Sequence, residues 1–367
     1  MRERLRAMVP SVVPIVLSLV GCFLAVVVLR GWSVAFDAFG AMFAGAFGDW
    51  PKFVDQGNAG LVLRPLGEAG NKAAILTLTG LSVAVAFRVG LFNIGAQGQL
   101  TVGALAAAVV GAKVDLPAVV HLPLCLLAAA VAGAGWAALP AVLKTTRGVH
   151  EVISTIMMNW IAVSLVENWL VVGPLKASAS GVNSISGTDQ IAASAELPRL
   201  FEGGSRLNAG LVLAVLAALV VWAFFGRLTR GFGWRVVGLN PEAARAAGVE
   251  VGQVVVQAML VAGALAGVAG AVLVLGTEQK YPTTLGAPYG FDGIAMALLG
   301  QGDALGVLVT SLVFGALRAG GTRLQLFGVH KSFPELIQGF ALLLVAARLV
   351  WERLARRLLP DREPKHG

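Results

Sequence analysis

The chain has 367 residues, of which 57% are hydrophobic and only 13% are charged. Apolar runs of about 20 residues recur along it, each long enough to cross a hydrocarbon core of roughly 30 Å, which excludes an ordinary soluble domain. The net charge of +8 gathers at the ends of these runs, a pattern typical of positively charged cytoplasmic loops and not of a nucleic-acid-binding face.

The apolar runs outline a multi-span topology. The first, at about 9–29, is long for a cleavable signal peptide and no clear cleavage site follows it, so an uncleaved anchor is favoured. The mixed segment 31–71 is expected at the interface or outside the membrane, and the segment 174–206, rich in Ser, Gly, Asn and Ala, as an extracellular loop. Further spans are expected at about 72–87, 95–112, 117–142, 151–173, 207–225, 253–275, 290–301, 304–320 and 334–350.

One of these runs, 290–301, is too short to cross alone and is bracketed by Gly290, Gly293, Gly300 and Gly302. A broken helix or half-span is tolerated only where it is packed inside protein. We therefore predict an all-α polytopic membrane protein with one domain over 1–367. It should have about 10 (8–10) transmembrane helices, with a broken or half-span near 290–301.

Lysine and arginine set the orientation. With the N-terminus inside and ten crossings, most of the 28 basic residues fall on short inside segments, whereas the others lie mostly on longer loops. Both termini and the loop 226–252 are then predicted to be cytoplasmic.

A short capped helix is predicted within this cytoplasmic loop. Asn240 is a favourable N-cap, Pro241 suits the first helical position, and Glu242 complements the helix dipole. Gly248 can adopt the left-handed conformation that ends a helix. A polar loop without a partner need not be so sharply structured, so we expect a docking site for a cytoplasmic motor. The candidate docking residues are Asn240, Pro241, Glu242, Ala244, Arg245 and Gly248.

Four amides interrupt the apolar pattern and are the predicted substrate-pathway residues. Asn93, Gln97 and Gln99 alternate with glycines just after a span, and Asn159 lies about two turns into another. One interpretation is a broken helix and a helix face that line the route of a polar solute. The alternatives are a tight turn whose amides satisfy loose backbone groups and, for Asn159, an interhelical hydrogen bond.

Two acidic residues leave their roles open. Glu167 is either a substrate or proton site or a snorkelling acid near the outer end of its span. Asp292 is well placed as an N-cap of the half-span, which is favoured over contact with the solute. Cys22 and Cys125 lie inside apolar runs and are expected to be small buried hydrophobes.

Motifs of enzyme chemistry are absent from the sequence. There is no Walker A pattern, no G-x-S-x-G elbow and no His/Cys cluster with zinc spacing. We therefore expect no catalytic residue, no cofactor and no metal site.

Four segments, in order, carry a family resemblance. They are FNIGAQGQ (92–99), EVISTIMMN (151–159), GLNPEAAR (238–245) and GFDGIA (290–295). Together they resemble the integral permease subunits of bacterial ABC importers in the branched-chain amino acid and simple-sugar group, and most closely those of nucleoside importers. Family members often carry Glu where this chain has Gln97, so a role there that needs a charge is not expected.

The resemblance implies the rest of a transport machine. Such permeases work by alternating access in the cytoplasmic membrane, with a second and often homologous permease, two cytoplasmic ABC ATPases and an extracellular substrate-binding lipoprotein. ATP hydrolysis is then expected on a separate subunit. The predicted helix at 240–248 corresponds to the family's coupling helix.

Two other functions compete with an ABC permease. A secondary, ion-coupled transporter predicts a buried carboxylate for its coupling ion, and a structural membrane subunit predicts no polar lining. Amide-rich lining suits a small neutral, hydroxyl-rich solute. The preference for a nucleoside over a simple sugar comes from the resemblance alone.

Overall fold

The computed structural model describes residues 2–177, 187–201, 205–330 and 332–347, with residues 2–12 and 346 as backbone alone. The α-helices are α1 (Arg2–Arg30), α2 (Trp32–Phe47), α3 (Trp50–Gln56), α4 (Gly60–Arg88), α5 (Ala96–Lys113), α6 (Ala118–Arg147), α7 (Glu151–Leu165), α8 (Gly210–Arg227), α9 (Thr229–Leu239), α10 (Pro241–Ala246), α11 (Val251–Leu273), α12 (Tyr289–Leu299), α13 (Ala304–Gly321) and α14 (Phe333–Ala346). Turns of π-helix continue α7 (Val166–Leu170) and α11 (Val274–Glu278), and 3-10 turns lie at Ala193–Ala195 and Thr322–Phe327.

The predicted all-α polytopic class is confirmed. Among the described residues, six helices are long and apolar enough to cross a membrane: Val13–Arg30, Gly60–Arg88, Ala118–Arg147, Gly210–Arg227, Val251–Glu278 and Ala304–Phe327. The other predicted spans correspond to α5, which has 18 residues, and to the shorter helices α7, α12 and α14. Helix α12 has 11 residues, about 16 Å of rise, so it is the short element predicted near 290–301.

The segment 31–71, which was expected at the interface or outside the membrane, forms α2, α3 and the first turns of α4. Helix α2 buries Ala35, Ala38 and Met42 and packs against α13 and α1. Helix α4 begins at Gly60, well before the predicted span start at 72. The sequence placed that start too late because polar residues fill the first turns of α4.

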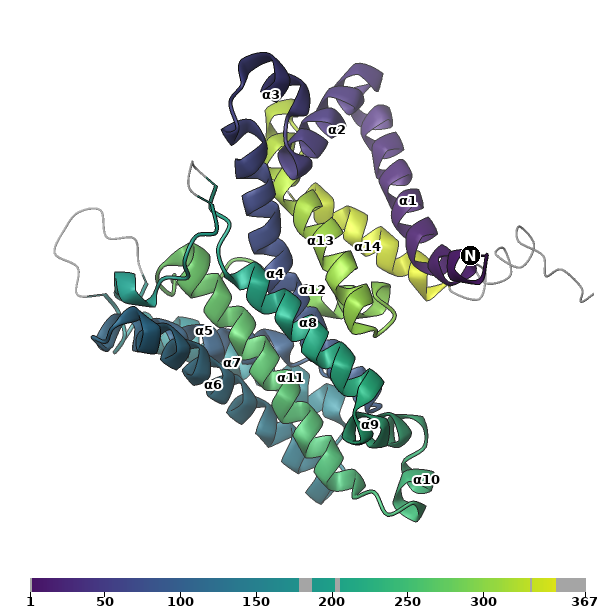
Figure 1. The fold of residues 1–367 in the computed structure, drawn as a ribbon, viewed down its shortest axis with the longest axis vertical. Helices are drawn as coiled ribbons and strands as arrows, with labels where there is room; N and C mark the ends of the chain where they lie inside the picture. Colours follow the sequence, from purple (N-terminus) through teal and green to yellow (C-terminus); the bar gives the residue numbers. More distant parts are fainter. Residues whose placement is uncertain (1, 178–186, 202–204, 331, 348–367) are drawn as a thin grey trace, which may run out of the picture.

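Helix α4 runs through the middle of the molecule (Figure 1). It packs against α13 and α12 on the side of α1, α2 and α14, and against α11 and α8 on the other. Helices α5, α6 and α11 cross closely because small residues face each other. A Cβ on Gly103 would overlap Gly267, and one on Gly133 would overlap the carbonyl of Gly263. Both cysteines are buried and free, as predicted.

Candidate functional site

Helix α10 lies at a corner of the molecule, in the turn between α9 and α11 (Figure 1). Asn240 Oδ1 accepts hydrogen bonds from the backbone N–H groups of Glu242 and Ala243, both at 3.0 Å. Gly248 has a φ of +83°, and its N–H donates to the carbonyl of Arg245 at 3.0 Å. Both predicted ends of this helix are confirmed, and both follow from local backbone chemistry.

The outer face of α10 is presented to the surroundings. Pro241, Glu242 and Arg245 are exposed, whereas Ala244 is fully buried and anchors the helix to the protein. Leu239, directly before the N-cap, is 87% exposed. Leu239 was not among the predicted docking residues, and it adds an apolar contact point beside the charged ones.

A second helix, α9, connects α10 to the membrane spans and was not predicted. Trp234 on α9 is buried with its ring 4.9 Å from that of Phe224 and 6.2 Å from that of Phe225 on α8. At the other end of α9, a Cβ on Gly238 would overlap the carbonyl of Arg88, the last residue of α4. Helix α9 is therefore held tightly against both α8 and α4, and α10 packs against α9.

The predicted pathway amides gather at the break between α4 and α5. Asn93 Nδ2 donates to Gln99 Oε1 at 3.0 Å, and Gln99 Nε2 donates back to Asn93 Oδ1 at 3.1 Å. Asn93 Oδ1 also accepts from the N–H of Gly95 at 3.0 Å. This reciprocal amide pair satisfies the turn that breaks the helix.

The other two amides tie neighbouring helices to the same turn. Asn159 on α7 accepts from the N–H of Gly98 and donates to the carbonyl of Ile94, both at 2.8 Å. Gln97 Oε1 accepts from the N–H of Gly290 at the start of α12, also at 2.8 Å. We call the residues 93–99 with Asn159 and Gly290 the amide junction.

All four amides are thus in one place, but buried and bonded within the protein. Asn93, Gln99 and Asn159 each use both the oxygen and the nitrogen of the amide, which favours the alternative of a satisfied turn and an interhelical hydrogen bond. Gln97 differs because, among the described residues, its Nε2 has no hydrogen-bond partner. A role of these amides in the solute pathway stays a prediction.

The expectation that Asp292 caps the half-span is wrong. Pro288 precedes α12, and Asp292 lies within its first turn. Asp292 Oδ2 is 2.6 Å from Nη1 of Arg318 on α13, and its Oδ1 accepts from Nε2 of Gln338 on α14 at 3.0 Å. The Arg318 and Asp292 side chains are only 9% and 10% exposed, so the ion pair lies inside the protein. It joins α12 to α13, and the hydrogen bond from Gln338 adds α14.

Sequence reasoning missed Arg318, although its position inside an apolar run could have identified it. It is a lone arginine within the apolar run 304–320, and ionisable groups in spans usually pair with one another. Glu167, the other open acid, accepts from the Tyr281 hydroxyl at 3.2 Å and from the N–H of Leu285 at 3.1 Å. It ties the end of α7 to the segment that precedes α12.

Comparison with known proteins gives a consistent family. Residues 68–346 match the family described as branched-chain amino acid transport system / permease component. The chain is 37% identical to the guanosine ABC transporter permease protein NupP of Bacillus subtilis (strain 168), with 95% of each chain covered. It is 35% identical to the glucose ABC transporter permease protein TsgB13 of Haloferax volcanii, covering 79% of this chain and 78% of the relative.

A third relative is the nucleoside ABC transporter permease protein NupB of Lactococcus lactis subsp. cremoris, 31% identical over 79% of this chain and 81% of its own. No solved structure matches the chain at a significant level.

Proposed function

The chain belongs to the branched-chain amino acid transport system permease family, and from this membership we propose that it forms the solute pathway of an ATP-driven importer. It would work with two cytoplasmic ABC ATPases, a second homologous permease and an extracellular substrate-binding lipoprotein, in the cytoplasmic membrane of a bacterium. Both termini and α10 would face the cytoplasm.

We propose a nucleoside as the solute. Two relatives that align over most of this chain are named for guanosine and for nucleosides, and one is named for glucose. All of these are neutral molecules rich in hydroxyl groups. A simple sugar is therefore the runner-up within the same chemical class.

The observation that carries the proposal is the shape and exposure of α10. Ala244 is the one buried side chain of this six-residue helix, and its other five side chains are exposed and available to a partner. Glu242 and Arg245 lie one turn apart on its exposed side. These charges, together with Leu239, would form the contact surface for an ATPase subunit.

Coupling follows from how α10 is attached. A displacement of α10 would reach α4 through the close contact between Gly238 and Arg88, and α8 through Trp234. The same helix α4 leads directly into the amide junction. We propose that the junction shapes the solute route and that Gln97, with its uncommitted nitrogen, is the amide that meets the solute.

The test is ATP-dependent nucleoside uptake in proteoliposomes that contain the permease pair and its ATPases, together with the substrate-binding lipoprotein. Glu242→Lys should lower ATPase binding and uptake about tenfold or more, because reversing a charge at an interface leaves its partner unpaired. Asp115→Lys is the matched control, since it reverses an exposed charge between α5 and α6, away from α10.

The control should insert and transport like the unaltered chain. Normal uptake by Glu242→Lys with its ATPases bound would contradict the docking role of α10. Uptake driven by an ion gradient without ATPase subunits would instead identify a secondary transporter.

A further inference from the structure

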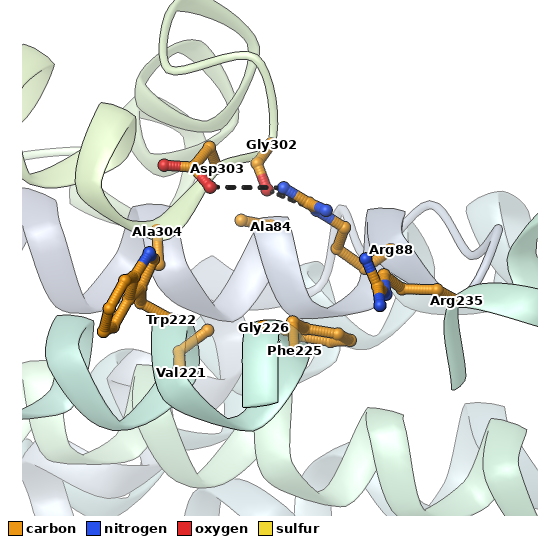
Figure 2. A pocket seen from close by; sticks show the side chains of 10 residues that line it. All are labelled: Ala84, Arg88, Val221, Trp222, Phe225, Gly226, Arg235, Gly302, Asp303 and Ala304. Carbon is orange, nitrogen blue, oxygen red and sulfur yellow. Dashed lines mark hydrogen bonds and ion pairs between the residues drawn. The ribbon is translucent and has the colours of Figure 1, made fainter. Parts of the chain in front are cut away.

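A polar pocket lies close to α9 and α10, where α4, α8, α9 and the start of α13 meet (Figure 2). Its volume is about 150 Å³. Figure 2 shows Arg88 and Arg235 on one side of it, Trp222 on the other, and Asp303 above. Two guanidinium groups and one carboxylate therefore face a single cavity.

The carboxylate is already engaged. Asp303 Oδ2 accepts from the N–H groups of Leu305 and Gly306 at 3.1 and 3.2 Å and so caps α13. Its Oδ1 is 3.4 Å from Nη2 of Arg88, whose Nε donates to the carbonyl of Gly302 at 2.9 Å. Arg88 is thus held in place, with its charge only partly balanced.

Arg235 has no such balance. Its Nε is buried and lacks a hydrogen-bond partner among the described residues. The guanidinium lies 5.7 Å from the ring of Phe232, a contact that attracts the cation but satisfies no N–H donor. With Arg88, Arg235 and Asp303 at their formal charges, the pocket carries a net positive charge, and a buried charged donor without an acceptor is costly.

An apolar pocket of about 400 Å³ adjoins the polar one, and the two share Val221 and Phe225 as a common wall. The apolar pocket is lined further by Val85, Val220, Phe224, Arg230, Trp234, Gln257 and Val261. Helix α8, which forms this wall, also exposes Leu216, Leu219 and Val220, as expected of a helix in contact with lipid. A positively charged pocket beside an apolar one fits a molecule with an anionic head and a hydrocarbon tail.

Trp222 indicates the depth of this site in the membrane. The guanidinium of Arg227 lies 4.8 Å from the centre of the Trp222 ring, and both residues stand at the end of α8. Tryptophan and arginine at the end of a span are typical of the headgroup region. The polar pocket therefore lies at the level of lipid phosphates.

We propose that the two pockets together bind one anionic phospholipid. Its phosphate would lie between Arg88 and Arg235, and one hydrocarbon chain would lie along Val221 and Phe225. Basic pockets between spans are known to favour anionic headgroups. Because Arg235 belongs to α9 and Arg88 to α4, the bound lipid braces the connection between the docking helix and the central span.

Lipid binding can be measured without transport, so it is independent of the proposed function. Native mass spectrometry of the purified full chain in detergent, titrated with phosphatidylglycerol or phosphatidylcholine, gives the two affinities. Phosphatidylglycerol should bind more tightly, since the choline ammonium adds a positive charge to a positive pocket. Arg235→Gln should weaken phosphatidylglycerol binding about fivefold, the effect of one basic group near a headgroup.

Asp303→Asn should act in the opposite direction. Asparagine can still cap α13, while the negative charge that competes with the phosphate is gone, so phosphatidylglycerol should bind about fivefold more tightly. This second variant keeps the test decisive if Arg235→Gln does not fold. Arg64→Gln is the matched control, because Arg64 is an exposed arginine at the opposite end of α4, and it should bind phosphatidylglycerol normally.

Three results would overturn the proposal. The first is equal affinity for the two lipids, and the second is unchanged phosphatidylglycerol binding in both pocket variants. The third is displacement of phosphatidylglycerol by inorganic phosphate alone, which would assign the pocket to a free anion and leave the apolar pocket without a role.

Discussion

Replacing Asn159 by leucine tests whether its side-chain amide stabilises the fold or contacts the solute. Asn159 is 3% exposed and bonds two backbone groups of the turn between α4 and α5, the N–H of Gly98 and the carbonyl of Ile94, both at 2.8 Å. Leucine has a similar size but neither donor nor acceptor. Both backbone groups would remain buried without partners.

The size of the effect follows from these two orphaned groups. A buried polar group left without its partner costs about 1–3 kcal/mol, so two predict a loss of about 2–6 kcal/mol in the free energy of unfolding. An ordinary side-chain hydrogen bond within a membrane contributes only about 0.6 kcal/mol. Relaxation is restricted, because a Cβ on Gly98 would already lie 3.0 Å from the Asn159 Cα.

The assay is unfolding of purified protein in detergent, together with uptake normalised to folded protein. Asn168→Leu is the matched control, since Asn168 is exposed in the π-turn that continues α7, and it should unfold like the unaltered chain. Asn159→Leu should have a much lower free energy of unfolding. Its total uptake should fall with the amount of folded protein, so its uptake per folded molecule should stay normal. Unaltered stability with abolished uptake would refute the structural reasoning and assign Asn159 to the solute route.

Three further predictions concern other elements. Asp292→Asn should destabilise the protein by about 3–5 kcal/mol, because the buried Arg318 loses its partner at 2.6 Å and keeps only a contact of 3.8 Å to Glu335, whose side chain is half exposed. Asp292→Asn combined with Arg318→Met should recover part of that loss in denaturant unfolding, and purely additive losses would contradict the ion pair. Gly248→Val should lower ATPase binding, because a left-handed backbone costs a residue with a Cβ about 1–2 kcal/mol, whereas Gly248→Asn should retain most of it. In intact cells an impermeant thiol reagent should label Arg199→Cys but not Ala246→Cys; labelling of both would contradict the predicted orientation.

The capped helix α10 shows what local sequence can predict. Its two ends depend on Asn240 and on Gly248, whose hydrogen bonds reach no further than three residues along the chain. The short helix near 290–301 was likewise predictable, since its length and flanking glycines are read directly from the sequence. The missed helix α9 has glycines at 231, 233 and 238, and those at 231 and 238 lie where α8 and α4 approach too closely for a Cβ.

The start of α4 shows where local reasoning fails. Its first three turns, up to Asn71, read as residues outside a span, and Lys72 stands at the predicted span start. Yet Asn71 Nδ2 donates to the carbonyl of Arg206, and Lys72 Nζ donates to that of Arg318. These partners are 135 and 246 residues away along the chain. A polar residue is acceptable inside a membrane protein once such a partner is present, and only the folded chain brings it there.

By itself the sequence determined the all-α membrane class, the capped helix α10 and the likeness to a permease family, because span length, helix caps and motif order are properties of contiguous residues. Tertiary structure decided which polar groups are satisfied: it joined Asp292 to Arg318 and bonded the four amides within the amide junction. It also placed Arg88 and Arg235 around one cavity (Figure 2). The physical reason is that burial and hydrogen bonding depend on neighbours in space, and those neighbours come from helices far apart in the chain.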